Sequence, residues 1–150
     1  MGSVTLTGDD VIKIRERRIT DVCNGDVATL DYGTDLSTTI VGKDGNTIIA
    51  HNEEGRMAVL TLRVLRGSPD DKYLNSERKQ YRTARANYNT LSAEITKQLG
   101  DGQGNSTQDV DLLKHGVISK MVPKSINESG ETEQAIAEYT ITFGDSDRVI

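Results

Sequence analysis

The sequence predicts a mainly β fold: an antiparallel β-sandwich or barrel with one α-helix and extended loops or arms. Three observations lead to this prediction. Apolar runs with strand periodicity recur between turn residues, only one segment carries helix-start signals, and strands do not alternate with helices as in parallel α/β proteins. The length predicts a single domain over residues 1–150.

The N-terminal third is expected to form two hairpins. Residues 11–22 partly alternate between apolar and polar types, and a turn signal at 24–26 precedes a returning strand at 27–32. The second hairpin joins strands at 36–41 and 47–50. The intervening turn contains Asp44-Gly45, a pair that supplies the positive-φ positions of hairpin turns.

The junction from Arg56 to Asn75 joins the strongest predicted strand to the clearest helix start. Residues 57–65 are almost all apolar or β-favouring, which suits a strand covered on both faces. Gly67 ends the strand, Ser68 is a good N-cap, and Pro69 fits the first helical position, with two aspartates at the positive end of the helix dipole.

The helix is expected to reach about Tyr88 and to pack shallowly, because it has few large aliphatic residues. Its basic side chains form either an interaction patch or a solvated face. They are Arg78, Lys79, Arg82 and Arg85.

Three strands are expected after the helix, the first two of them joined in a hairpin. Residues 91–99 fit a strand or a helix, but the glycine-rich segment after them and the strand near 117–122 favour a strand in a hairpin. Residues 135–143 alternate cleanly, with Ala135 through Phe143 placing every second residue on one apolar face. The segments 1–10, 100–109 and 123–133 lack such patterning and are expected to be arms or loops.

The composition indicates a thin core and an acidic surface. Hydrophobic residues make up 35% of the chain, with one Phe and no Trp, so oligomerisation is a natural source of added stability. The net charge of −5 argues against a dedicated nucleic-acid binder. The lone Cys23 suits packing, and without a signal peptide or long apolar run we expect cytoplasmic synthesis and no membrane insertion.

No residue pattern indicates catalysis, so we expect no enzyme and no catalytic, cofactor-binding or metal-binding residues. His51 and His115 are the only histidines and have no metal-ligand spacing. The loop from Gly100 to Asn105 lacks the lysine of a phosphate-binding loop. A calcium loop using Asp101, Asn105 and Asp109 is a lesser alternative to a flexible hairpin tip.

The order of these elements resembles the tail tube proteins of contractile-tailed bacteriophages. The likeness covers about residues 11–144 and is carried by the hairpin-rich first half, the strand starting at Arg56, the break Gly67-Ser-Pro-Asp-Asp-Lys-Tyr-Leu-Asn75 into a single helix, and the closing strand 138–144. Residues 100–133 match the family least well.

This resemblance implies hexameric rings that stack into a hollow tube inside a contracting sheath. It implies a location in the virion tail after assembly in the host bacterial cytoplasm, with sheath, baseplate and tail-terminator proteins as partners. DNA would cross an acidic lumen without specific binding. The turn of the second hairpin is the candidate ring contact. Its residues are Lys43, Asp44, Gly45 and Asn46.

A monomeric β-sandwich module that binds glycan or peptide is the alternative function. Such modules usually present exposed aromatic platforms. The five tyrosines of this chain are spread out, and three of them fall at helical spacing, where packing explains them.

Overall fold

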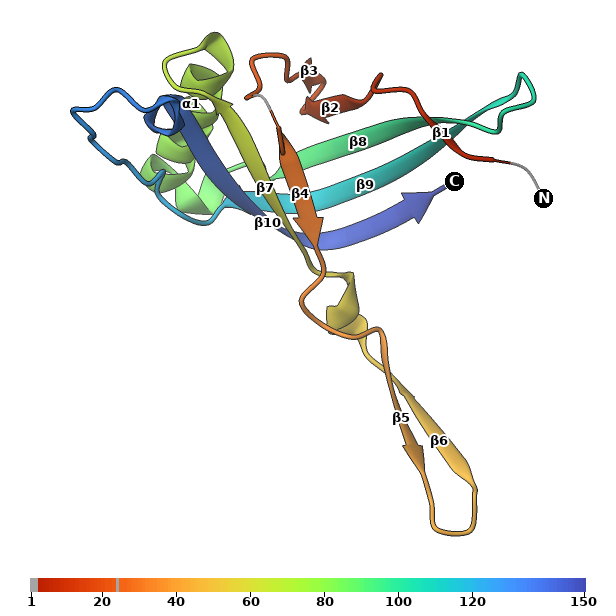
Figure 1. Cartoon of the computed structure of the whole chain (residues 1–150). Helices are drawn as coiled ribbons and strands as arrows, with labels where there is room; N and C mark the ends of the chain where they lie inside the picture. Colours follow the sequence, from red (N-terminus) through yellow and green to blue (C-terminus); the bar gives the residue numbers. More distant parts are fainter. Residues whose placement is uncertain (1–2, 24) are drawn as a thin grey trace.

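The computed structural model describes residues 3–23 and 25–150, and it contains one antiparallel sheet, one separate hairpin and one α-helix (Figure 1). The sheet strands are β1 (Thr5–Leu6), β2 (Val11–Ile14), β3 (Arg17–Arg18), β4 (Ala28–Asp31), β7 (Ala58–Leu65), β8 (Leu91–Gly100), β9 (Ser106–Ile118) and β10 (Ile136–Val149). The separate hairpin consists of β5 (Ser37–Val41) and β6 (Thr47–His51), and the helix α1 spans Pro69–Thr83. Three short 3-10 helices are η1 (Glu53–Arg56), η2 (Arg85–Asn87) and η3 (Thr132–Ala135).

The long strand β10 joins the two halves of the sheet, whose order is β3-β2-β8-β9-β10-β7-β4. Its first half pairs with β7 from Ile136 to Phe143, and its second half pairs with β9 from Ile141 to Val149. Beyond this overlap each half has its own partners, and β4 and β7 cross β8 and β9 at a steep angle in Figure 1. The mainly β, antiparallel fold with one helix is therefore confirmed, in a sandwich-like form.

The core lies on one face of β7 and β10. The buried residues alternate along both strands, each at most 1% exposed, as the period-two pattern predicts. They are Ala58, Leu60, Leu62 and Val64 of β7, and Ala137, Tyr139, Ile141 and Phe143 of β10. Two details differ from expectation. The second face of β7 is only half-buried, and Ala135 is exposed in η3, before β10 begins.

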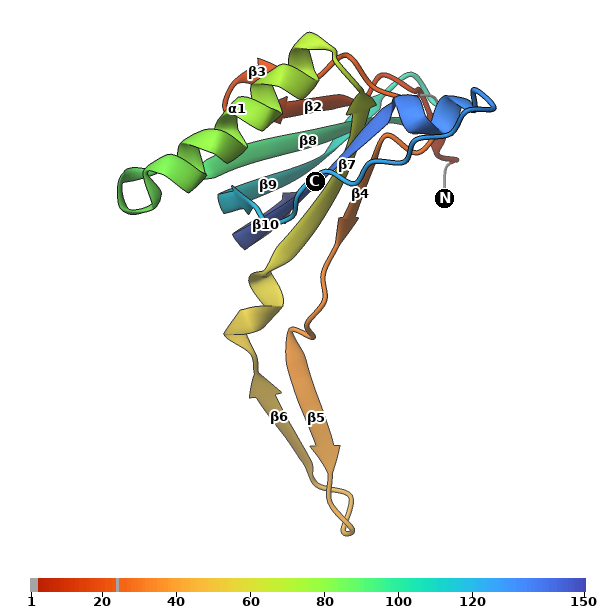
Figure 2. The ribbon, with the colours of Figure 1, turned by 90° about the vertical axis from the view of Figure 1, so that its left-hand side faces the viewer.

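The helix lies over the sheet beside β2, β3 and β8 (Figure 2). Ser68 caps it, since its side chain accepts a hydrogen bond from the Asp71 N–H at 3.3 Å. Leu74 is its fully buried aliphatic residue, which fits the expected shallow packing. The helix ends at Thr83 rather than near Tyr88, and η2 then turns the chain so that the Tyr88 hydroxyl donates to Glu77 at 2.9 Å.

Asp70 has a larger structural role than a favourable position on the helix dipole. It is 2% exposed and accepts hydrogen bonds from the backbone N–H groups of Thr20 at 2.8 Å and Asp21 at 2.9 Å. The Arg17 Nε donates to the same carboxylate at 3.0 Å. One helix residue thereby fixes the segment that leads from β3 toward β4.

We predict that Asp70→Asn lowers the free energy of unfolding at neutral pH by about 2–4 kcal/mol, because hydrogen bonds to a charged group are lost. Burial raises the pKa of Asp70, but the Asp21 and Thr20 N–H groups and Arg17 together outweigh it, so the pKa is lowered. The stabilisation is thus present above the unfolded-state Asp pKa of about 3.9 and is lost as the pH falls through the lower folded-state pKa. Urea unfolding at several pH values should show the wild type and variant converging in acid; a constant difference would contradict this.

The expected hairpin between residues 11–22 and 27–32 is wrong. Strand β2 stops at Ile14, because Arg15 and Glu16 adopt φ values of 49° and 68° that turn the chain into β3. Strand β2 instead pairs with β8, and β4 pairs with β7. The predicted turn includes residue 24, which lies outside the described residues.

The segments 1–10 and 100–109, which were expected to be arms or loops, are partly built into the sheet. Residues 5 and 6 pair with β8, and residues 106–109 belong to β9, which starts well before residue 117 and ends at Ile118. Neither of these two segments has a strand-like apolar pattern. Their place in the sheet therefore depends on backbone hydrogen bonds to the neighbouring strand. Residues 91–99 form β8 in a hairpin with β9, and residues 119–131 form a loop without helix or strand.

Candidate assembly site

The hairpin β5–β6, here called the arm (Ser37–His51), projects away from the body in both ribbon views (Figures 1 and 2). All ten of its strand residues are exposed. Among the described residues its two strands pair only with each other. The arm therefore receives no support from the core of its own chain.

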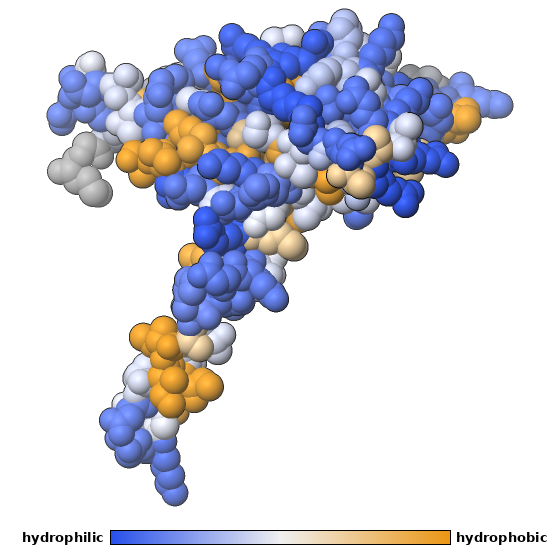
Figure 3. Space-filling view, turned by 180° about the vertical axis from the view of Figure 1, so that it is seen from behind, coloured by the Kyte–Doolittle hydropathy of each residue, from blue (hydrophilic) through white to orange (hydrophobic). Residues whose placement is uncertain are grey.

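The arm carries apolar side chains on both faces. Residues opposite each other in an antiparallel pair share a face. Ile40 lies opposite Ile48 on one face, while Val41 and Ile49 lie on the other, opposite Thr47 and Thr39. These four side chains are 60% to 70% exposed. Figure 3, which views the molecule from behind, shows an apolar zone along the arm that a polar stretch separates from the body.

Such an element is poorly suited to isolated existence in water. A two-stranded hairpin is at best marginally stable by itself, and contiguous exposed apolar surface commonly marks an interaction site. A hairpin on the outside of a monomeric protein usually has one polar face. Since both faces of this arm carry exposed apolar side chains, we interpret it as an element that a partner covers.

The four predicted contact residues lie together at the tip of the arm. Gly45 has a φ of +86°, and the Gly42 N–H donates to the Asn46 carbonyl at 2.7 Å. The Asn46 side-chain amide donates to Asp44 at 2.6 Å. Three of the four residues thus shape the turn, and Lys43 is exposed beside them.

The strand residues of the arm are further candidate contacts that were not predicted from the sequence. The sequence does contain a signal for them. Thr39-Ile-Val41 and Thr47-Ile-Ile-Ala50 place apolar residues at consecutive positions, whereas a strand with one solvent-exposed face alternates between apolar and polar residues. Whether Lys43 and its neighbours touch a partner stays a prediction.

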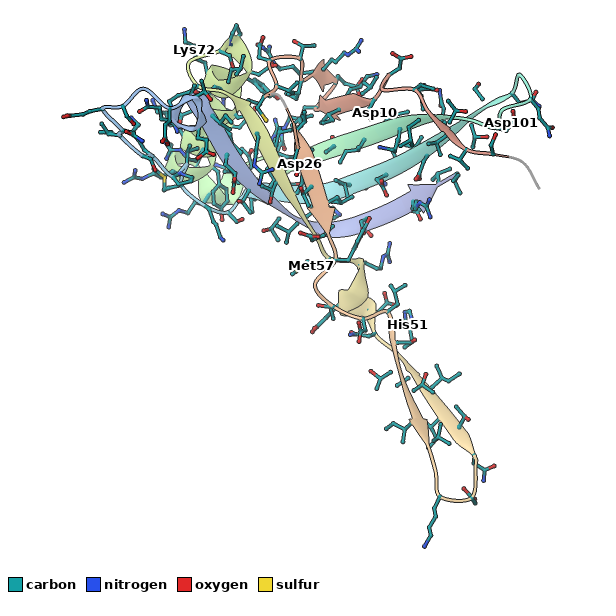
Figure 4. All side chains as sticks on the ribbon, viewed as in Figure 1. Asp10, Asp26, His51, Met57, Lys72 and Asp101 are labelled. Atoms are coloured by element: carbon teal, nitrogen blue, oxygen red, sulfur yellow. The ribbon has the colours of Figure 1, made fainter. Side chains whose placement is uncertain are left out.

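The base of the arm is fixed to β10. Arg56 of η1 pairs with Asp145 at 2.7 Å, and the Ser146 hydroxyl donates to the Arg56 carbonyl at 2.7 Å. The Asn52 N–H donates to the Leu36 carbonyl at 2.8 Å, where the two chain segments of the base meet. Figure 4 shows this region between the labelled His51 and Met57. The base of the arm is therefore held to the body by specific contacts.

Gly55 allows the two segments at the base to come close together. A Cβ at this position would lie 2.8 Å from the Leu36 Cα and 2.9 Å from the Asp35 carbonyl oxygen, and both are backbone atoms. We predict that Gly55→Val redirects the arm and impairs assembly while most of the body stays folded. Gly33→Val is the control, since a Cβ there meets nothing within 4 Å. Circular dichroism and light scattering of both variants would check this, and normal assembly of Gly55→Val would contradict it.

The histidines and the glycine-rich loop do not form a common site. His51 lies on the arm and contacts Glu53 at 3.1 Å, whereas His115 lies at an irregular point of β9 with a φ of 58°. Asp101 accepts hydrogen bonds from Gln103 and Asn105, which lower its pKa and hold the tight turn.

The calcium alternative gains no support from this geometry. Asp109 pairs with Arg148 through two contacts of 2.8 and 2.9 Å and is thus occupied. Within residues 3–23 and 25–150, no group of three His, Cys, Asp or Glu side chains is placed to hold a metal ion. Over the same residues, no helix is both long and apolar enough to cross a membrane.

Comparison of the sequence with models of known protein families finds no match, and comparison with curated proteins also finds none.

Proposed function

We propose that this chain is a structural subunit that assembles into stacked hexameric rings, forming the hollow tail tube of a contractile-tailed phage. The arm is the observation that carries the proposal. It extends a pair of β-strands with apolar residues on both faces away from the core, which a monomer would leave in water. A neighbouring copy that covers it would add the apolar burial that the chain lacks.

Open sheet edges also support self-association. Among the described strands, β4 pairs only with β7, and none pairs with residues 144–149 of β10 on the side away from β9. Unpaired strand edges are ready sites for pairing with another chain. Pairing between different edges of successive copies is head to tail, which gives rings or open stacks according to the rotation.

The remaining parts of the proposal come from the resemblance to tail tube proteins. The net charge of −5, repeated around each ring, suits a lumen that DNA crosses without specific binding. Sheath, baseplate and tail-terminator proteins are the proposed partners, and the virion tail is the proposed location.

Light scattering after size exclusion, followed by negative-stain microscopy, tests the proposal over a range of protein concentrations. We expect ring-sized species that grow into hollow tubes as the concentration rises. Monomers at every concentration would contradict the proposal. Monomers that bind a glycan or peptide saturably would favour the alternative of a binding module.

A further inference from the structure

We propose that the arm of one copy docks in a groove on the body of a second copy, alongside the free edge of β10. This inference rests on the proposed function and names the receiving site for the arm. The groove, about 620 Å³ in volume, lies between the β4–β5 connection and the end of β10. Its lining includes Leu30, Tyr32, Leu36, Arg56, Ser146 and Arg148.

Part of the groove wall is apolar and accessible. Tyr32 is 47% exposed and Leu36 is 62% exposed, while Leu30 packs against the core beneath them. Large side chains in such positions favour an apolar occupant.

The two arginines that line the groove already have partners within the chain. Arg148 pairs with Asp109 at 2.8 Å, and Arg56 pairs with Asp145 at 2.7 Å. The Tyr32 hydroxyl contacts Asp111 at 3.5 Å. Because both arginines are neutralised by carboxylates, the groove offers no free cation for an anionic ligand. Since Asp111 and Asp147 also line the groove, this chemistry disfavours an anionic segment.

One side of the groove is formed by the β10 edge. Residues 145–149 pair with β9 on one side and with no described strand on the other. An extended segment can add to such an edge through backbone hydrogen bonds while its alternate side chains enter neighbouring apolar surface. The arm fits this requirement, since β5 and β6 are each five residues long and each leaves its outer edge unpaired.

The occupant must come from another copy. Both ribbon views show the arm directed away from its own body, and Leu36 and Gly55 at its base line the groove from which it departs. Arm and groove are different surfaces, so the contact is heterologous and each copy both gives and receives an arm. The contact therefore propagates without limit unless it closes into a ring.

Cross-linking of two single-cysteine proteins tests this inference. In a Cys23→Ala background, one protein carries Ile49→Cys on the arm and the other carries Tyr32→Cys in the groove. A short bismaleimide should give a cross-linked dimer in the mixture that neither protein forms alone. Ile126→Cys replaces the arm cysteine as a control, because Ile126 is also highly exposed, at 88%, but lies in the loop 119–131. That mixture should give no such dimer.

Microscopy of the same samples distinguishes failure of the proposed docking site from failure of the proposed assembly function. Rings or tubes without the arm-to-groove dimer would overturn the docking site and leave the assembly function standing. A dimer formed by the Tyr32→Cys protein alone would also overturn it, because the groove would then face another groove. Monomers in every sample would overturn both.

Discussion

The Leu60→Asp protein should fail to fold. Leu60 is 0% exposed on the central strand β7, between β10 and β4. The change removes about 1.5–3 kcal/mol of apolar burial. It also places a carboxylate among Leu62, Ile141 and Phe143, where no partner is available in the core, and burial of an unpaired charge costs several kcal/mol more. The sum is comparable to the total stability of about 5–15 kcal/mol of a typical domain.

Leu65→Asp is the matched control, since Leu65 ends the same strand and is 45% exposed. We expect this protein to fold with a small loss of stability. Far-ultraviolet circular dichroism, thermal unfolding and the soluble yield of both proteins measure the difference. A soluble Leu60→Asp protein with cooperative unfolding would show that the core is placed incorrectly.

Replacing three apolar arm residues with threonine should abolish assembly without unfolding the body. The variant Ile40→Thr/Ile48→Thr/Ile49→Thr keeps β-branched side chains, so the hairpin retains its strand preference. Each change removes about two buried carbon groups at about 0.8 kcal/mol each, giving about 5 kcal/mol at one interface. At about 1.4 kcal/mol per factor of ten, association weakens by about 10³-fold.

The same type of substitution outside the arm provides the control. Ile126→Thr changes a side chain that is 88% exposed in the loop, and we expect assembly as in the wild type. Sedimentation velocity compares the oligomers, and thermal unfolding checks the body. Full assembly of the triple variant would mean that the apolar arm is not the main contact.

The sequence predicts those elements whose pattern is local. Examples are the apolar run of β7, the N-cap at Ser68 and the positive-φ glycine at Gly45. Each of these signals lies within a few residues, and each element lies where it was predicted. The partners of β2 and β4 were predicted incorrectly, because nearness in sequence favours a hairpin whereas long-range pairing with β8 and β7 prevails. The predicted start of β9 was too far along the sequence for a related reason. Its residues 106–109 are polar, and they belong to the sheet through backbone pairing with β8.

The candidate site was only partly accessible to sequence reasoning. Asp44-Gly45 identifies a hairpin tip, but a turn signal does not reveal that the strands leave the body. The groove combines residues from β4, η1, β9 and β10, which are brought together only by the fold. Asp70 is similar: its place in the first helical turn is clear from sequence, whereas its bonds to Thr20 and Asp21 depend on tertiary packing.

Cryo-electron microscopy of the wild-type protein, concentrated under assembly conditions, tests the central claim most directly. We predict hollow rings or tubes in which density for residues 37–51 of each copy contacts the body of a neighbouring copy. Assemblies in which these residues stay in solvent, or particles that remain monomeric at every concentration, would contradict the claim that this chain assembles through its arm.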